Sequence, residues 1–261
     1  MDSLLGIAYS QRGQFENSAA MLKEAVRTYQ ALVADCPDVP EYRHALGLTY
    51  SALGVQYFHN MQQAEKAEAA HQQALQIYEK LVHEHPDVWE YAYYLGHCYY
   101  SLAMDAQLKR RWDELLTNDE KAIEVLEHLV GRGYGQLRPD LFDAWLLRAT
   151  ALAGRGEHAR ATHEANAVAR QEGAGQINHY NIACVFALSS AAAENDGKLA
   201  PADRARLKAQ YADRAVDFLR QAVAEGYEDA PGLKGDPDLT SLHSREDFQK
   251  LVREVERKSR K

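Results

Sequence analysis

The stretch EYRHALGLTYSALG, residues 41–54, decides the fold because it returns later in the chain as EYAYYLGHCYYSLA, residues 90–103. Two tyrosines and the Leu-Gly pair between them recur 49 residues later in the second copy. The segments that precede the copies, ALVADCPDVPEY (31–42) and KLVHEHPDVWEY (80–91), match at the same spacing. Two adjoining blocks that share one spacing indicate an internal structural repeat.

The spacing of Leu46, Gly47 and Tyr50 resembles the core of the tetratricopeptide repeat pattern. Residues four apart share one face of a helix, and a glycine beside the leucine lets a partner helix approach closely. The opening stretch LLGIAYSQRGQF (4–15) carries the same block, followed by a turn into a second helix. Each block therefore predicts a helical hairpin.

The repeats are longer than the usual 34 residues of this pattern. In the first hairpin the helical pattern continues past Ala25 to Pro37, which adds about two turns. A further insertion, VQYFHNMQQAEKA (55–67), gives the spacing of 49 residues. It is rich in Ala, Gln, Glu and Lys, so we expect it to lengthen the helices rather than form a loop.

The whole chain is predicted to be an all-α, right-handed α-solenoid of extended tetratricopeptide hairpins. We expect hairpins 1–3 in residues 1–130, a glycine-rich connector in 131–140, hairpins 4 and 5 in 141–235, and a capping helix with a basic tail in 236–261. The apolar stripe of that last helix can cover the open end of the stack, and it comprises Phe248, Leu251, Val252 and Val255.

Composition restricts the partners and the compartment. A formal net charge of −8 argues against a general nucleic-acid binder, because such affinity comes mostly from neutralising phosphates. The longest weakly polar run, IACVFALSSAAA (182–193), is too short to span a bilayer, and the first residues do not read as a signal peptide. We interpret Cys36, Cys98 and Cys184 as buried, reduced thiols of a cytoplasmic protein.

No pattern predicts a catalytic centre, a metal site or a cofactor. GRGYG (131–135) follows no strand and precedes no lysine-bearing helix start, so a connector is the better interpretation. His83 and His85 are two residues apart, which puts them on different faces of a helix. His97 and Cys98 are adjacent and also point in different directions, so a structural thiol is favoured over a nucleophile.

The first helices of tetratricopeptide hairpins line the concave side of the superhelix, and their side chains there are candidates for a partner-binding groove. In the third hairpin these are Tyr93, His97 and Tyr100, and in the others they are His44, Leu48, Ser51, Tyr180, Asn181 and, beside them, Cys184. An aromatic stripe with hydrogen-bonding groups suits an extended peptide or a helix. The alternative is that these tyrosines fill space between the lengthened helices.

Two tracts point to a narrower resemblance. PDVPEYRHALGLTYSALG (37–54) with EKLVHEHPDV (79–88) resembles the tetratricopeptide arrays that follow the kinase domain in large bacterial serine/threonine protein kinases, especially those of planctomycete type. YNIACVFAL (180–188) and DPDLTSLHSREDF (236–248) are similar to the terminal segment of such proteins. Met1 falls at about the third position of a first helix, which predicts that the helix begins upstream.

Three functions follow as hypotheses. The first is a non-catalytic scaffold that binds a protein or peptide in the groove. The second is a regulatory or substrate-docking segment of a kinase whose catalytic motifs are not found in this sequence. The third is a small enzyme with a site between helices, which rests only on scattered His and Cys residues.

Overall fold

The computed structural model describes residues 15–59, 63–171 and 178–258. It divides into two compact units, Met1–Gly135 and Gln136–Lys261, which are described separately below. In the described part of the chain every regular element is a helix, and consecutive helices pack in pairs. The all-α fold of helical hairpins predicted from the repeat is thereby confirmed.

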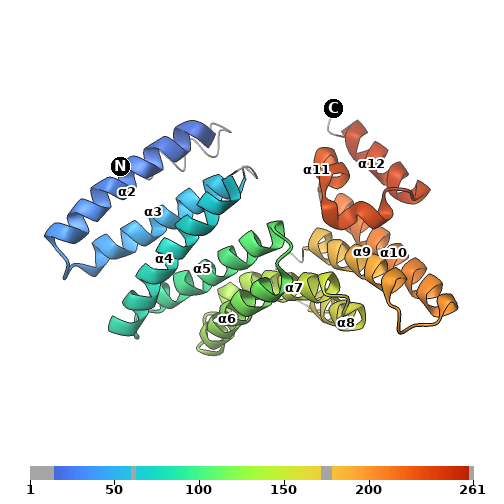
Figure 1. Ribbon diagram of the computed structural model, residues 1–261, viewed down its shortest axis with the longest axis horizontal. Helices are drawn as coiled ribbons and strands as arrows, with labels where there is room; N and C mark the ends of the chain where they lie inside the picture. Colours follow the sequence, from blue (N-terminus) through green and yellow to red (C-terminus); the bar gives the residue numbers. More distant parts are fainter. Residues whose placement is uncertain (1–14, 60–62, 172–177, 259–261) are drawn as a thin grey trace. The chain divides into compact units, whose positions relative to one another are not determined.

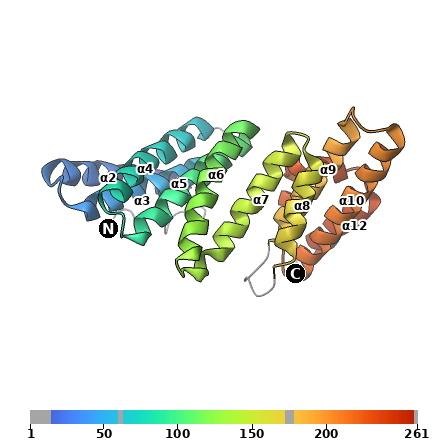
Figure 2. The same cartoon turned by 90° about the horizontal axis from the view of Figure 1, so that it is seen from below.

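The first unit contains five described helices in which each one packs against the next along the chain (Figures 1 and 2). They are α2 (Phe15–Asp35), α3 (Pro40–Phe58), α4 (Ala64–Glu84), α5 (Trp89–Leu108) and α6 (Trp112–Gly131). The first helices of successive hairpins, α3 and α5, also contact each other. Most of the 55–67 insertion extends α3 and begins α4, as predicted, while residues 60–62 lie outside the described chain.

Equivalent positions in the two copies of the repeat form equivalent hydrogen bonds. The Pro-Asp-Val turns before α3 and α5 are closed alike, by Val39 N–H to the Cys36 carbonyl at 3.3 Å and by Val88 N–H to the His85 carbonyl at 3.1 Å. The recurring tyrosines both bond to the preceding helix. Gln30 Nε2 donates to the Tyr50 hydroxyl at 2.8 Å, and the Tyr99 hydroxyl donates to Glu79 Oε1 at 3.0 Å. These pairs are 49 residues apart, so the repeat preserves contacts between hairpins.

The glycine of the Leu-Gly pair permits the close approach of α4 to α3. A Cβ atom at Gly47 would stand 2.8 Å from Cε2 of Tyr78, whose side chain is fully buried. The apolar faces of α2, α3 and α4 also form a shared core, which comprises Leu22, Val26, Leu46, Leu53, Tyr57, Ala67 and Ala70. Each helix thus buries its apolar stripe only by packing on its neighbours.

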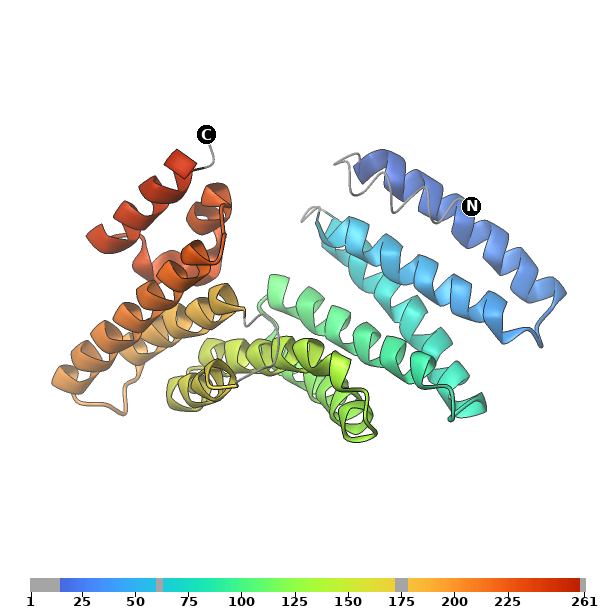
Figure 3. The same cartoon turned by 180° about the vertical axis from the view of Figure 1, so that it is seen from behind.

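The second unit continues the pattern with two hairpins and a C-terminal subdomain (Figure 3). The hairpins are α7 (Arg138–Gly154) with α8 (His158–Ala169), and α9 (His179–Asn195) with α10 (Pro201–Ala224). The subdomain contains α11 (Ala230–Gly235), the 3₁₀ helix η3 (Pro237–Leu242) and α12 (Glu246–Lys258). Here η3 packs on α9, and α12 packs on α11 and α10.

The structure differs from the sequence predictions at three places. The expected connector 131–140 is partly helical, because η2 (Gly135–Leu137) leads directly into α7, where Pro139 is accommodated in the first turn. The short helix α11 lies at the end of the span expected for hairpins 4 and 5, and η3 precedes the capping helix in the expected C-terminal segment. Cys36 is exposed in the turn after α2, so the prediction of a buried thiol is wrong at this position, whereas Cys98 and Cys184 are buried.

Candidate functional site

Aromatic side chains follow one face of α5 from its first turn. The ring centroids of Trp89 and Tyr93 are 6.2 Å apart, and those of Tyr93 and His97 are 4.6 Å apart in an edge-on arrangement. Trp89 also stacks on Tyr134, which follows α6, with centroids 4.6 Å apart and ring planes inclined by 22°. We call Trp89, Tyr93, His97 and Tyr134 the α5 aromatic ladder. It includes two of the predicted groove residues.

The residues of the ladder are half-buried, so each keeps part of its surface open to solvent, although Nε2 of His97 is itself buried. Aromatic rings offer large, rigid contact areas at low conformational cost, while hydroxyl and imidazole groups add hydrogen bonds. Tyr100, the third predicted residue on α5, is also half-buried. Sequence reasoning did not include Trp89 or Tyr134. Trp89 could have been predicted from the sequence, because it precedes Tyr93 by four residues and therefore lies on the same helix face.

The side chain of His44 packs between helices. Its ring lies 5.8 Å from Tyr78, 5.4 Å from Tyr91 and 5.2 Å from Tyr94, measured between centroids. Its Nδ1 is also within 3.2 Å of the Tyr78 hydroxyl. Burial lowers the pKa of His44, and the charge of Glu90 opposes that shift. The His44 ring therefore packs among tyrosines of α4 and α5, and its contribution to a groove stays a prediction.

Ser51 and Leu48 complete the predicted set on α3. Ser51 Oγ lies 4.0 Å from Cys98 Sγ, which ties α3 to α5. Leu48 is half-buried. The ring and side-chain contacts that the structure describes for His44 and Ser51 are therefore made with Tyr78 of α4 and with Tyr91, Tyr94 and Cys98 of α5 rather than with the ladder.

Two of the three candidates of the second unit, Tyr180 and Cys184, contact its own C-terminal segment. The Tyr180 hydroxyl donates to Asp236 Oδ2 at 2.5 Å, and its ring stacks on Tyr227 with centroids 4.7 Å apart. Cys184 Sγ donates to the same carboxylate at 3.7 Å, and the backbone N–H of Asn181 donates to the Asn178 side chain. Burial raises the pKa of Tyr180, and Cys184 and Asp236 raise it further. Tyr180 and Cys184 therefore anchor the segment between α11 and η3.

Buried polar side chains of α4 and α5 join the second hairpin to the third. His71 Nδ1 on α4 and Asp105 Oδ2 on α5 are 2.6 Å apart. Nearby, Glu68 Oε2 accepts hydrogen bonds from Lys109 at 2.6 Å and from Arg111 at 2.8 Å. Burial raises the pKa of Glu68, but the two cations outweigh it and leave the pKa lowered.

A histidine–carboxylate pair is also the arrangement that orients imidazole in acid–base catalysis. Here the ring faces protein rather than an open cleft: a Cβ atom at Gly54 would stand 2.3 Å from His71 Nε2. The side chains of His71 and Asp105 are only 3% and 1% exposed. Without access for a substrate, the pair serves packing between the hairpins.

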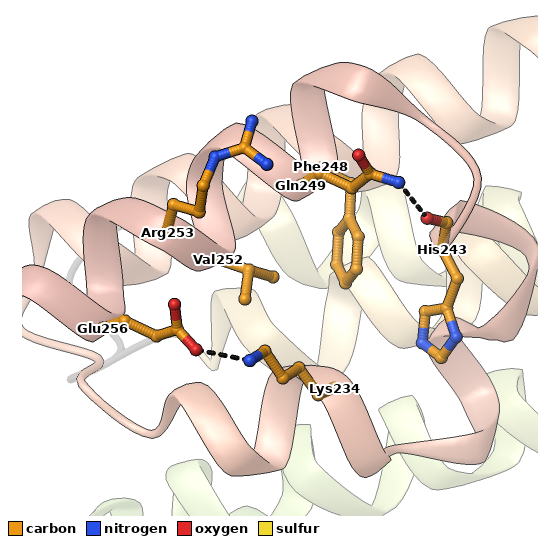
Figure 4. Close-up of a pocket in the computed structure, with 7 residues that line it drawn as sticks. All are labelled: Lys234, His243, Phe248, Gln249, Val252, Arg253 and Glu256. Carbon is orange, nitrogen blue, oxygen red and sulfur yellow. Dashed lines mark hydrogen bonds and ion pairs between the residues drawn. The ribbon is translucent and has the colours of Figure 1, made fainter.

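A cavity that sequence reasoning missed lies in the C-terminal subdomain, between α11 and α12 (Figure 4). Its volume is about 280 Å³, and its lining residues are Lys234, His243, Phe248, Gln249, Val252, Arg253 and Glu256. Four of these residues are charged or titratable, whereas Phe248 and Val252 belong to the buried stripe of α12. No sequence signal marked it, because it depends on how the unpredicted α11 packs.

Comparison with known proteins supports the repeat architecture. A family model described as tetratricopeptide repeat matches residues 3–35, a stretch that ends with α2. No curated protein matches the sequence significantly. None of the helices that the structure describes is both long and apolar enough to cross a membrane. The family match and the paired, repeating helices together support a tetratricopeptide repeat array.

Proposed function

We propose that this chain is a protein-interaction scaffold that binds a polypeptide on the α5 aromatic ladder. Tetratricopeptide repeats generally mediate protein–protein interactions, and helical arrays of this kind typically serve as non-catalytic scaffolds. The observation that carries the proposal is the run of half-buried rings at Trp89, Tyr93 and His97 along one face of a single helix.

The ladder suits a polypeptide for physical reasons. Its rings are held by each other and by Tyr134, so little conformational entropy is lost when a partner covers them. Tyr and Trp are also the residues that contribute most to binding energy at protein interfaces. A bound segment can pack apolar side chains across the rings and use the tyrosine hydroxyl for hydrogen bonds.

The proposal is tested by capturing partners from a lysate of the source organism with two matched double variants. Tyr93→Ala with His97→Ala removes the centre of the ladder. Tyr99→Ala with Glu79→Ala removes the hydrogen-bonded pair that joins α5 to α4 at 3.0 Å. We expect the ladder variant to lose its partners and the control variant to keep them. Equal capture by both variants would show that the partner binds elsewhere.

A second candidate is a docking or regulatory segment of a bacterial serine/threonine kinase. It is favoured by the resemblance of residues 37–54 and 79–88 to the arrays that follow such kinase domains. Sequencing the gene upstream of the codon for Met1 tests this candidate. An open reading frame that continues into kinase motifs supports it, and a stop codon directly upstream rejects it.

A further inference from the structure

The excess negative charge of this chain belongs to its first unit. Residues 1–135 contain 19 acidic and 11 basic side chains, whereas residues 136–261 contain 19 of each. The formal charge of −8 is therefore the charge of the unit that carries the α5 aromatic ladder. An excess of one sign of charge on a compact unit attracts partners of the opposite sign and repels those of the same sign. This charge restricts the chemistry of a partner on the ladder.

Four of these acidic residues belong to the repeated segments that begin α3 and α5. Asp87 and Glu90 flank Trp89, the first ring of the ladder. Asp38 and Glu41 occupy the corresponding positions 49 residues earlier. All four residues are exposed, and none forms an ion pair within residues 15–59, 63–171 and 178–258. Their charge is therefore available to a partner.

The charges of Glu41 and Glu90 act on the same ring, although they come from different hairpins. Burial raises the pKa of Tyr91, and the charges of Glu41 and Glu90 raise it further. The charge of Arg43 opposes this effect, but Arg43 is itself paired with Glu84. The two carboxylates thus both lie near Tyr91 on α5, where they add to the negative potential at the start of that helix.

Two positive contributions oppose the carboxylates near the ladder. The helix dipole places about half an elementary positive charge at the start of α5. Arg132, an exposed residue, lies two positions before Tyr134 in the chain. Asp87 and Glu90 together carry two negative charges at the start of α5, and Glu41 adds a third from α3. Negative charge therefore prevails beside the ladder.

Glu90 also shares a helix face with the ladder. It precedes Tyr93 by three residues and His97 by seven, so the three side chains lie on one side of α5. An acidic residue in the first turn stabilises a helix through its dipole, which accounts for Glu90 and for Glu41 in α3. It does not account for the aromatic residues on the same face. The combination of half-buried rings with an exposed carboxylate points to a ligand that contacts both.

The side chain that satisfies both groups is arginine. Its guanidinium is attracted to the face of a tyrosine or tryptophan ring, and its planar fork can donate two parallel hydrogen bonds to a carboxylate. The chain itself contains such contacts between cations and rings. Lys121 Nζ lies 4.9 Å from the ring centroid of Tyr99 on α5, and the Arg214 guanidinium lies 4.8 Å from that of Phe218.

We propose that the polypeptide segment bound on the α5 aromatic ladder is basic and carries arginine. Its guanidinium stacks on the ladder and pairs with Glu90, while Asp87 attracts a second basic side chain. An apolar side chain between the two basic ones covers the remaining ring surface. The inference rests on the proposed scaffold function, because it names the partner chemistry of that same surface. Acidic segments and nucleic acids are repelled by the same charges.

The test is a nuclear magnetic resonance titration of the full chain with three blocked pentapeptides. They are acetyl-Gly-Arg-Leu-Arg-Gly-amide, its citrulline analogue, which has the same shape without the charge, and its Glu analogue. We expect the Arg peptide to shift the indole N–H of Trp89 and the backbone amide of Tyr93. The citrulline peptide should bind at least about fivefold more weakly, and the Glu peptide should cause no shift. Equal binding of the Arg and citrulline peptides, or no shift at these two groups, overturns the proposal.

Two matched double variants show whether the carboxylates beside the ladder are responsible. Asp87→Asn with Glu90→Gln removes two negative charges there, and Glu120→Gln with Glu124→Gln removes two from exposed positions of α6. We expect the first variant to bind the Arg peptide at least about fivefold more weakly and the second to stay within about twofold of the unmodified chain, because salt screens distant charges. If the two variants behave alike, the proposed pairing is wrong. Circular dichroism establishes first that both variants are folded.

The titration and the capture experiment fail independently. Loss of capture by the Tyr93 and His97 variant, together with equal binding of the Arg and citrulline peptides, rejects the basic partner and leaves the scaffold function intact. Unchanged capture by that variant, together with a charge-dependent shift of the Trp89 indole, rejects the ladder as the surface for the captured protein and leaves its preference for basic peptides intact.

Discussion

His71 and Asp105 form a buried hydrogen bond of 2.6 Å between α4 and α5, and thereby join the second hairpin to the third. Polar groups at such depth are stable only when they are paired, because each has lost its contacts with water. The pair therefore fixes which residues of α4 meet α5. Glu68 with Lys109 and Arg111 extends this polar contact toward the turn after α5.

The first prediction concerns this pair. Because His71→Ala leaves the Asp105 carboxylate buried without its partner, we expect a loss of about 3–5 kcal/mol in the free energy of unfolding. Replacing both residues by leucine should cost less than the sum of the two single leucine variants, by about 1 kcal/mol or more. Urea unfolding of all variants measures this coupling. Additive losses would mean that the two side chains do not interact.

The second prediction concerns Gly54. A Cβ atom there would stand 2.2 Å from Cδ2 of His71, whose ring is fixed by Asp105 and cannot easily move. Gly54→Ala should therefore lower the free energy of unfolding by about 1–3 kcal/mol. Gly131→Ala is the matched control, since no atom lies within 4 Å of a Cβ there. The control should be neutral or slightly stabilising in a thermal melt, and an equal loss in both would refute the steric argument.

The third prediction concerns the thiols. Burial raises the pKa of Cys98 to about 12, with Ser51 opposing and Glu79 reinforcing the shift. Burial also raises the pKa of Cys184, as does the charge of Asp236. Since the thiolate is the reactive form, we expect Cys36, which is exposed, to react quickly with a disulfide reagent at pH 8. The two buried thiols should react only in denaturant. Rapid reaction of three thiols in the native chain would contradict this assignment.

The fourth prediction concerns acid stability of the C-terminal subdomain. Arg245 donates hydrogen bonds to Asp247 and also to Asp213, and its contact lowers the pKa of Asp247, against an opposing effect of burial. A carboxyl group whose pKa is lower in the folded state stabilises the fold above its unfolded pKa of about 3.9. That contribution disappears as the pH falls through the folded pKa.

We therefore expect Arg245→Met to weaken the pH dependence of stability below about pH 4. Lys250→Met is the control, because Lys250 is exposed on α12, the helix that carries Asp247. Chemical unfolding at a series of pH values, followed by circular dichroism, gives the two slopes. If the Arg245 variant and the control have the same slope, the ion pair does not set the acid response.

Sequence periodicity was sufficient for the hairpins because their contacts repeat with the sequence. The bonds of Tyr50 and Tyr99 to the preceding helix illustrate this, since both partners recur at the same spacing. It was also sufficient to place Tyr93 and His97 on one face of α5, where their rings touch. That partners bind there stays a prediction.

Contacts that depend on non-repeating pairs could not be predicted in the same way. His71 meets Asp105 across 34 residues, yet neither residue recurs at the repeat spacing. The orientation of His44 was set by the tyrosines of α4 and α5 rather than by its own helix. The cavity beside α12 required α11, a six-residue helix too short to show a periodic pattern.

Photo-crosslinking from the α5 aromatic ladder tests the central claim most directly. Tyr93 is replaced by p-benzoylphenylalanine, and the same replacement at Glu124, an exposed residue of α6, serves as the control. We predict that the protein captured by the unmodified chain becomes covalently linked at position 93 and not at position 124. Crosslinking at position 124 alone, or at neither position while capture persists, would contradict the assignment of the ladder as the binding surface.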